Sequence, residues 1–228
     1  MILALASIFS AIISEAKAET FIFPLDYEIT SDGAEPQGPM PWVTATFIDV
    51  SPDNVQLTMS ASNLTGTEFI TKWFFNSGID ATGLTFTPDS GNSLAISTPT
   101  INTGLNAYKA DGDGYFDIRF DFQTSAGTGR FTSGETVIYN IGGSSLSASS
   151  FNFISAPDGA GTGLYYSAAK VQGINGNDNT SGWIANTTVV PEPISSILFL
   201  SGGATLAVRR YLRRGKKISL EHTSTRYY

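Results

Sequence analysis

The chain has 228 residues, no cysteine and one histidine, His222, which lies close to the C-terminus. This length suits one ordinary domain with short terminal segments, and the body contains no disulfide, thiol nucleophile, Ser-His-Asp centre or usual zinc site. Between Glu19 and Val208 the chain carries 5 basic and 18 acidic residues, a formal charge of −13, which argues against nucleic-acid binding by the body.

The first 18 residues have the organisation of a secretory signal peptide. An uncharged apolar run, Ile2 to Ile13, is followed by Ala16-Lys17-Ala18, the small-x-small pattern at which signal peptidase cleaves. We therefore predict a signal helix over residues 1–18, with Ala16 and Ala18 defining the cleavage site and Glu19 beginning the mature chain. The alternative is a buried N-terminal helix, which is disfavoured because the run ends in the small-x-small pattern that a peptidase requires.

Residues 19–185 are predicted to form an all-β domain, an antiparallel β-sandwich or jelly roll. Apolar and polar residues alternate along 43–48 and along 55–62, and Ser51-Pro52-Asp53-Asn54 between them is typical of a hairpin turn. Short apolar segments separated by Gly, Asn, Asp and Pro continue this pattern. Further strands are expected at 68–75, 84–87, 94–97, 115–122, 136–141, 151–155 and 164–174.

One acidic turn in the body could bind a metal ion. The segment Asp111-Gly112-Asp113-Gly114-Tyr115-Phe116-Asp117 places carboxylates at relative positions 1, 3 and 7, which resembles the start of a calcium loop. Asp111, Asp113 and Asp117 are therefore the candidate calcium ligands, although the bidentate acid of an EF-hand is missing. The alternative is an Asp/Gly turn opening a strand on which Asp117, Arg119 and Asp121 face solvent.

Two glycan-related functions remain open for this domain. Pairs among Asp113, Asp117 and Asp121 could act as the acid and nucleophile of a glycosidase, but acids along a strand usually form a solvated face, so no enzyme is predicted. Aromatic faces could stack on sugar rings, although most of them should belong to the core. The candidate platforms are Trp42, Trp73, Phe74, Phe75, Tyr165, Tyr166 and Trp183.

The C-terminal part of the chain has the features of a membrane segment. After a linker, 186–190, Pro191-Glu192-Pro193 leads into an uncharged run, Ile194 to Val208, which predicts a transmembrane helix. Its 15 residues cover about 22 Å of a hydrocarbon layer near 30 Å thick, so this anchor is weak. Arg209, Arg210, Arg213 and Arg214 begin a basic cluster, which predicts a cytoplasmic tail with the body outside the cytoplasm. The alternative is a core or amphipathic helix that closes the domain.

The order of these segments resembles the PEP-CTERM sorting signal of exported bacterial proteins. The resemblance covers 191–217, with Pro191, Glu192, Pro193 and the four arginines as its sorting residues, and 218–228 as a further tail. It implies recognition by an exosortase, a membrane-embedded transpeptidase-like enzyme, in bacteria that make exopolysaccharide. The implied partners are signal peptidase, the exosortase, the inner membrane and exopolysaccharide.

The combined expectation is an exported surface or matrix protein. In this interpretation the chain is held briefly in the inner membrane, is then sorted to the cell surface or the extracellular space, and carries a non-enzymatic structural or adhesive β-domain. The alternative is a calcium-assisted carbohydrate-binding module.

Overall fold

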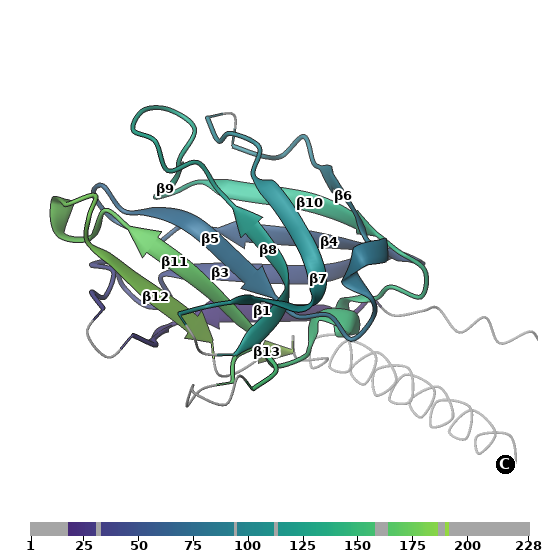
Figure 1. Ribbon diagram of the computed structural model, residues 1–228. Helices are drawn as coiled ribbons and strands as arrows, with labels where there is room; N and C mark the ends of the chain where they lie inside the picture. The colour runs from purple at the N-terminus through teal and green to yellow at the C-terminus, as the bar shows by residue number, and fades with distance from the viewer. Residues whose placement is uncertain are drawn as a thin grey trace, which may run out of the picture. The chain divides into compact units, whose positions relative to one another are not determined.

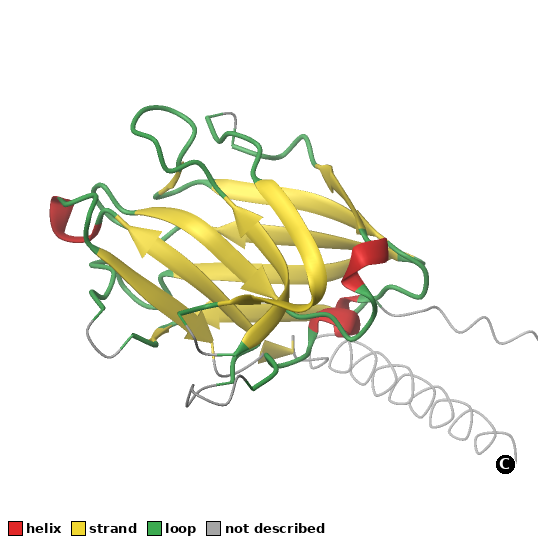
Figure 2. Ribbon diagram, in the orientation of Figure 1, coloured by secondary structure: helices red, strands yellow, loops and turns green. Residues whose placement is uncertain are grey.

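The computed structural model describes residues 18–30, 33–93, 95–111, 114–157, 164–186 and 190–191. They form a β-sandwich of two antiparallel sheets stacked in two layers (Figure 1). Helix is confined, in this described part, to three short 3-10 turns (Figure 2): η1 Ala81–Gly83, η2 Ala148–Phe151 and η3 Ile174–Gly176. The predicted all-β class is therefore confirmed, while the signal helix and the transmembrane helix lie outside the described residues.

The first sheet, sheet A, has the strand order β13-β1-β3-β4-β10-β6. Its strands are β1 Thr20–Leu25, β3 Val43–Ser51, β4 Asn54–Ser60, β6 Thr85–Pro88, β10 Thr136–Gly142 and β13 Val190–Pro191. The predicted hairpin is confirmed as β3 and β4. Asp53 adopts φ 62 in its turn, a left-handed conformation that Asp tolerates better than most side chains.

The second sheet, sheet B, has the order β2-β12-β11-β5-β8-β7, and β9 also pairs with β5. Its strands are β2 Tyr27–Glu28, β5 Phe69–Phe75, β7 Thr100–Lys109, β8 Tyr115–Asp121, β9 Phe131–Thr132, β11 Ser167–Gln172 and β12 Ser181–Asn186. Only Asp26 separates β1 from β2, so the chain passes from sheet A to sheet B at this residue.

The core between the sheets is rich in aromatic side chains. The ring of Phe47 lies 5.5 Å from Phe23, 5.2 Å from Phe75 and 4.2 Å from Phe151, centroid to centroid. All four side chains are at most 1% exposed. Edge-to-face and stacked ring contacts of this kind add to the free energy of burying the rings, and here they join both sheets to η2.

A smaller cluster lies on the outer face of sheet B. Phe74 and Phe116 pack there with the buried residues Ala110, Tyr165, Ala168 and Ala185, separate from the main core. As expected for adjacent strand residues, Phe75 faces the main core while Phe74 faces outward. Phe116 belongs to this outer cluster while Ile118 and Phe120 face the main core, and β7 is irregular opposite this part of β8.

Two predicted strands are wrong. Residues 95–97 form no strand, and 151–155 contain the end of η2 followed by irregular chain. Residues near 151 form a 3-10 turn instead of a strand because Ser147 and Ser150 make a reciprocal capping box at the start of η2. Strands β1, β7 and β12 were not predicted, since the alternation in each is interrupted by Pro or Gly.

The sandwich extends beyond residue 185, its expected end. Asn186 is fully buried in β12, and Val190–Pro191 pairs with Ile22 and Phe21 of β1. The expected linker, 186–190, therefore begins inside one sheet and ends in the other, and the compact unit reaches Pro191. Proline is tolerated in β13 because this strand lies at the edge of sheet A.

Candidate functional site

Two of the three predicted calcium ligands lie among the described residues, and their surroundings differ. Asp111 lies on an exposed turn with φ 50, and Asp113 lies outside the described residues. Asp117 is 6% exposed, so the prediction that it faces solvent is wrong. No group of three acidic or histidine side chains suited to a metal ion occurs in the described part of the chain.

Both carboxylate oxygens of Asp117 have partners within the fold. The backbone N–H of Asn106 donates to Oδ1 at 2.7 Å, and the backbone N–H of Ser77 donates to Oδ2 at 3.0 Å. Asn106 lies in the irregular middle of β7, and Ser77 follows β5. These bonds fit the turn interpretation of this segment, because they tie the Asp117 carboxylate to the backbone of two neighbouring loops.

The glycosidase pairing also lacks support in the geometry. Asp121 accepts hydrogen bonds at 2.9 Å from Asn102 and 2.8 Å from Arg119, so its partners differ from those of buried Asp117. Elsewhere, hydrogen bonds from Thr82 lower the pKa of Asp80, and those from Gly91 and Asn140 lower the pKa of Asp89. The general acid of a glycosidase needs the opposite shift.

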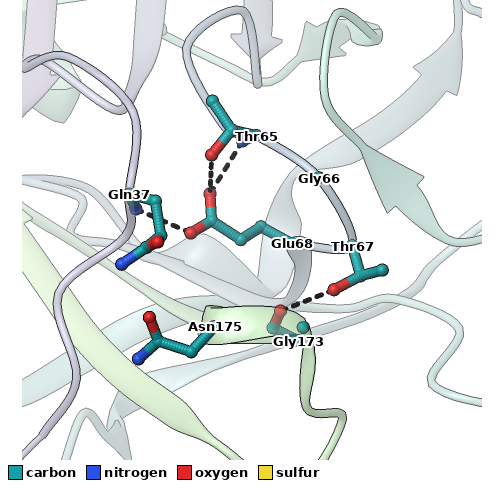
Figure 3. A pocket seen from close by; sticks show the side chains of 8 residues that line it. Gln37, Thr65, Gly66, Thr67, Glu68, Gly173 and Asn175 are labelled. Carbon is teal, nitrogen blue, oxygen red and sulfur yellow. Dashed lines mark hydrogen bonds between the residues drawn. The ribbon is translucent and has the colours of Figure 1, made fainter.

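A polar hollow lies where the loop before β5 meets the loop after β11 (Figure 3). Its acidic group, Glu68, is 1% exposed and accepts backbone N–H bonds at 2.7 Å from both Gln37 and Thr65. Thr67 Oγ1 closes the other side by donating to the carbonyl of Gly173 at 2.8 Å. The Glu68 carboxylate already accepts hydrogen bonds from the loops that line the hollow. We therefore interpret its role here as holding these loops together.

Most of the candidate sugar platforms belong to the interior. The buried set, at most 5% exposed, comprises Trp42, Trp73, Phe74, Phe75 and Tyr165. Tyr166 is partly exposed but packs against the main core. Trp183 is partly exposed on the outer face of sheet B, and the Nζ of Lys170 lies 5.5 Å from its ring centroid.

The outer faces of the two sheets differ in charge. Outward positions of β1, β3, β4 and β10 in sheet A carry no charged residue; they hold Thr, Ser, Asn, Gln, Ile, Val, Gly and Pro. The corresponding face of sheet B carries Lys72, Arg119 and Lys170, since their sequence neighbours Trp73, Phe120 and Val171 face the core. We call these three cations and Trp183 the basic face.

The basic face is built by cross-strand pairing. Four cross-strand partners form one row across β12, β11, β5 and β8. Trp183 of β12 lies opposite Lys170 of β11. Lys72 of β5 lies between Lys170 and Asp121 of β8 and pairs with both. Figure 1 shows these four strands side by side. Arg119, two residues before Asp121, forms an ion pair with it at 2.8 Å, and its guanidinium lies over the ring of Tyr108 at 4.8 Å.

No protein-family model, curated protein or solved structure matches the chain. The basic face was not predicted as a site, although its residues are visible in the sequence. The one available signal was that basic residues are rare in the body and that Lys72 and Lys170 each lie within a predicted strand. Their pairing could not be predicted, because it depends on which strands become neighbours.

The predicted sorting and processing residues fall almost entirely outside this description. Ala18 is described, and Pro191 is described as the last residue of β13. Ala16, Glu192, Pro193 and the arginines at 209, 210, 213 and 214 lie outside the described residues. No helix among the described residues is both long and apolar enough to cross a membrane.

Proposed function

We propose that this chain is an exported surface or matrix protein that an exosortase processes at its C-terminus. The observation that carries the proposal is the order of segments in the sequence. A leader ending at Ala18 precedes the acidic body, and Pro191-Glu192-Pro193, an apolar run and a basic cluster follow it. In this proposal the β-sandwich is a non-enzymatic structural or adhesive domain that works with exopolysaccharide.

The limits of the sandwich support this assignment. β1 begins at Thr20, two residues after Ala18, and β13 ends at Pro191, the first residue of the Pro-Glu-Pro motif. Cleavage beyond each of these residues would therefore leave both sheets intact. Pro191 is the one residue of the proposed signal that lies in a described strand.

The experiment is intact-mass analysis of surface material from an exosortase-bearing host. We expect a chain that begins at Glu19 and ends near Pro193. Glu192→Ala should leave the basic tail attached and keep the protein in the inner membrane, whereas Glu35→Ala, at an exposed position of the body, should be processed normally. Wild-type surface protein that still contains Arg209 to Tyr228 would contradict the proposal and indicate an ordinary membrane anchor.

A carbohydrate-binding module is the second candidate function. The observation that favours it is Trp183, a partly exposed ring beside a lysine on a sheet face. In this second candidate function calcium is not required, because the carboxylate of Asp117 already has a structural role as an acceptor of two backbone hydrogen bonds.

A further inference from the structure

We propose that the basic face of sheet B binds an acidic polysaccharide, with Lys72 and Lys170 contacting its carboxylates and Trp183 stacking on a sugar ring. This inference deepens the proposed function, because it rests on the chain meeting polysaccharide outside the cell and names the chemical class of that polysaccharide.

The first argument is the segregation of positive charge. Among 5 basic residues between Glu19 and Val208, four lie on strands of sheet B, namely Lys72, Lys109, Arg119 and Lys170. The described strands of sheet A contain no lysine or arginine. Because the chain from Glu19 to Val208 has a formal charge of −13, the outer face of sheet B is where an anionic partner meets the least repulsion.

The second argument is the direct opposition of two lysines. Lys72 and Lys170 are cross-strand partners, and like charges at such positions destabilise a sheet. In the part of the chain that the structure describes, neither lysine has a carboxylate within ion-pair distance. The available anion, Asp121, is bound by Arg119 and Asn102. A ligand carboxylate placed between the two ammonium groups would relieve this repulsion.

The third argument is the aromatic end of the same row. The ammonium group of Lys170 lies over the ring of Trp183, so a sugar that takes its place on the indole would bring its carboxylate beside that group. From Trp183 to Asp121 the row crosses three strand intervals, about 14 Å, which leaves room for a short stretch of polymer. The basic face thus combines a stacking surface with separated cations.

The same features disfavour nucleic acid as the ligand. A DNA duplex carries one negative charge about every 1.7 Å of its axis. The basic face has three cations and includes the ion-paired Asp121 within its row, on a domain that is acidic elsewhere. A polymer with carboxylates spaced along neutral rings matches this sparse charge better than a polyphosphate does.

The test measures binding of the purified full-length chain to polygalacturonate, a uronic acid polymer, by isothermal titration calorimetry. Because Arg209, Arg210, Arg213, Arg214, Lys216 and Lys217 would also attract a polyanion, all variants carry glutamine at these six positions. In this background we expect Lys72→Gln/Lys170→Gln to weaken binding roughly tenfold, as expected for the loss of two charge contacts made by partly exposed side chains. Binding should also weaken as salt is added.

The matched control is Gln56→Glu/Thr136→Glu, which changes the net charge by the same amount on the outer face of sheet A. It should leave the dissociation constant within about twofold of the background chain, because it alters only distant charges. Near-ultraviolet circular dichroism reports whether each variant is folded. If the lysine variant unfolds, the inference is still tested on the background chain, which keeps both lysines. The salt dependence of its binding and its comparison of ligands then decide the outcome.

Three results would overturn the inference: equal binding to neutral dextran and polygalacturonate, tighter binding to a short DNA duplex, or no binding to polygalacturonate at low salt. Equal losses in the lysine variant and the control would do the same. Because the assay involves no exosortase, its outcome is independent of C-terminal processing. A protein that is processed as proposed but binds no acidic polymer would therefore overturn this inference and leave the proposed function standing.

Discussion

The buried carboxylate of Asp117 joins two parts of the chain that have no strand pairing with each other. One oxygen accepts from Asn106 in β7 and the other from Ser77 after β5. Asn106 has φ 48, a conformation that leaves its N–H without a regular ladder partner, and the aspartate supplies the missing acceptor. Glu68 acts in the same way between Gln37 and Thr65. In both cases a buried acid stabilises loops by accepting hydrogen bonds from their backbone N–H groups.

We predict that Asp117→Asn lowers the free energy of unfolding by about 2 kcal/mol, the contribution typical of hydrogen bonds to a buried charged group. The amide keeps one acceptor oxygen but turns an N–H₂ group toward the other backbone N–H. Urea unfolding measures the difference. Asp26→Asn, at an exposed position, is the control and should change stability by less than about 0.5 kcal/mol. Equal effects of the two substitutions would refute a structural role for Asp117.

At the scale of elements, one ion pair joins the loop before β9 to the loop between β11 and β12. Arg130 contacts Asp178 at 2.8 Å, and its guanidinium lies 3.9 Å from the ring centroid of Phe69 in β5. The hydrogen bond from Arg130 holds the pKa of Asp178 below its ordinary value. The ionised form of Asp178 is therefore favoured in the folded protein.

This lowered pKa predicts the pH range in which the pair stabilises the fold. The contribution should be present above the unfolded-state pKa, about 3.9, and should be lost as the pH falls through the lower folded-state pKa. Asp178→Asn should therefore melt below wild type at pH 7, and the gap should close in strong acid. Thermal melts from neutral pH to about pH 2 measure this difference. If the difference in melting temperature between wild type and Asp178→Asn is as large near pH 2 as at pH 7, ionisation of Asp178 is not its cause.

At the scale of the whole molecule, both ends of the sandwich lie at one edge of sheet A. Phe21 of β1 pairs with Pro191 of β13, and the backbone N–H of Glu19 donates to Asp49 Oδ2 at 3.0 Å. The other oxygen of Asp49 accepts from Ala148 in η2 at 2.6 Å. If the leader is removed after Ala18, the amide nitrogen of Glu19 becomes an ammonium group beside this carboxylate.

We therefore predict that Asp49→Asn destabilises a chain beginning at Glu19 more than it destabilises the chain that retains residues 1–18. The bond to Ala148 is weakened in both chains, but only the shorter chain also loses an ion pair, worth about 0.5 kcal/mol at an exposed site. The four proteins are wild type and Asp49→Asn, each with and without residues 1–18. Their free energies of unfolding in low salt show whether the substitution costs more in the shorter chain. The same loss in both backgrounds would argue against a mature terminus at Glu19.

Local sequence patterns were sufficient for the all-β class and for the β3–β4 hairpin. Two-residue alternation reports which side of a strand is apolar, and Pro52, Asp53 and Asn54 encode the turn within a few residues. The rule that adjacent strand residues face opposite ways was also sufficient to separate Phe74 from Phe75. The targeting segments are likewise continuous in sequence and stay predictions of function.

Tertiary structure alone decided the burial of Asp117 and the composition of the basic face. An aspartate looks solvent-exposed in a strand pattern until the irregular part of β7 brings the backbone of Asn106 to it. Lys72 and Lys170 lie on strands distant in the sequence, and their opposition arises because β5 and β11 became neighbours. Alternation specifies which face a side chain occupies, whereas strand order and register depend on how the two apolar faces pack against each other.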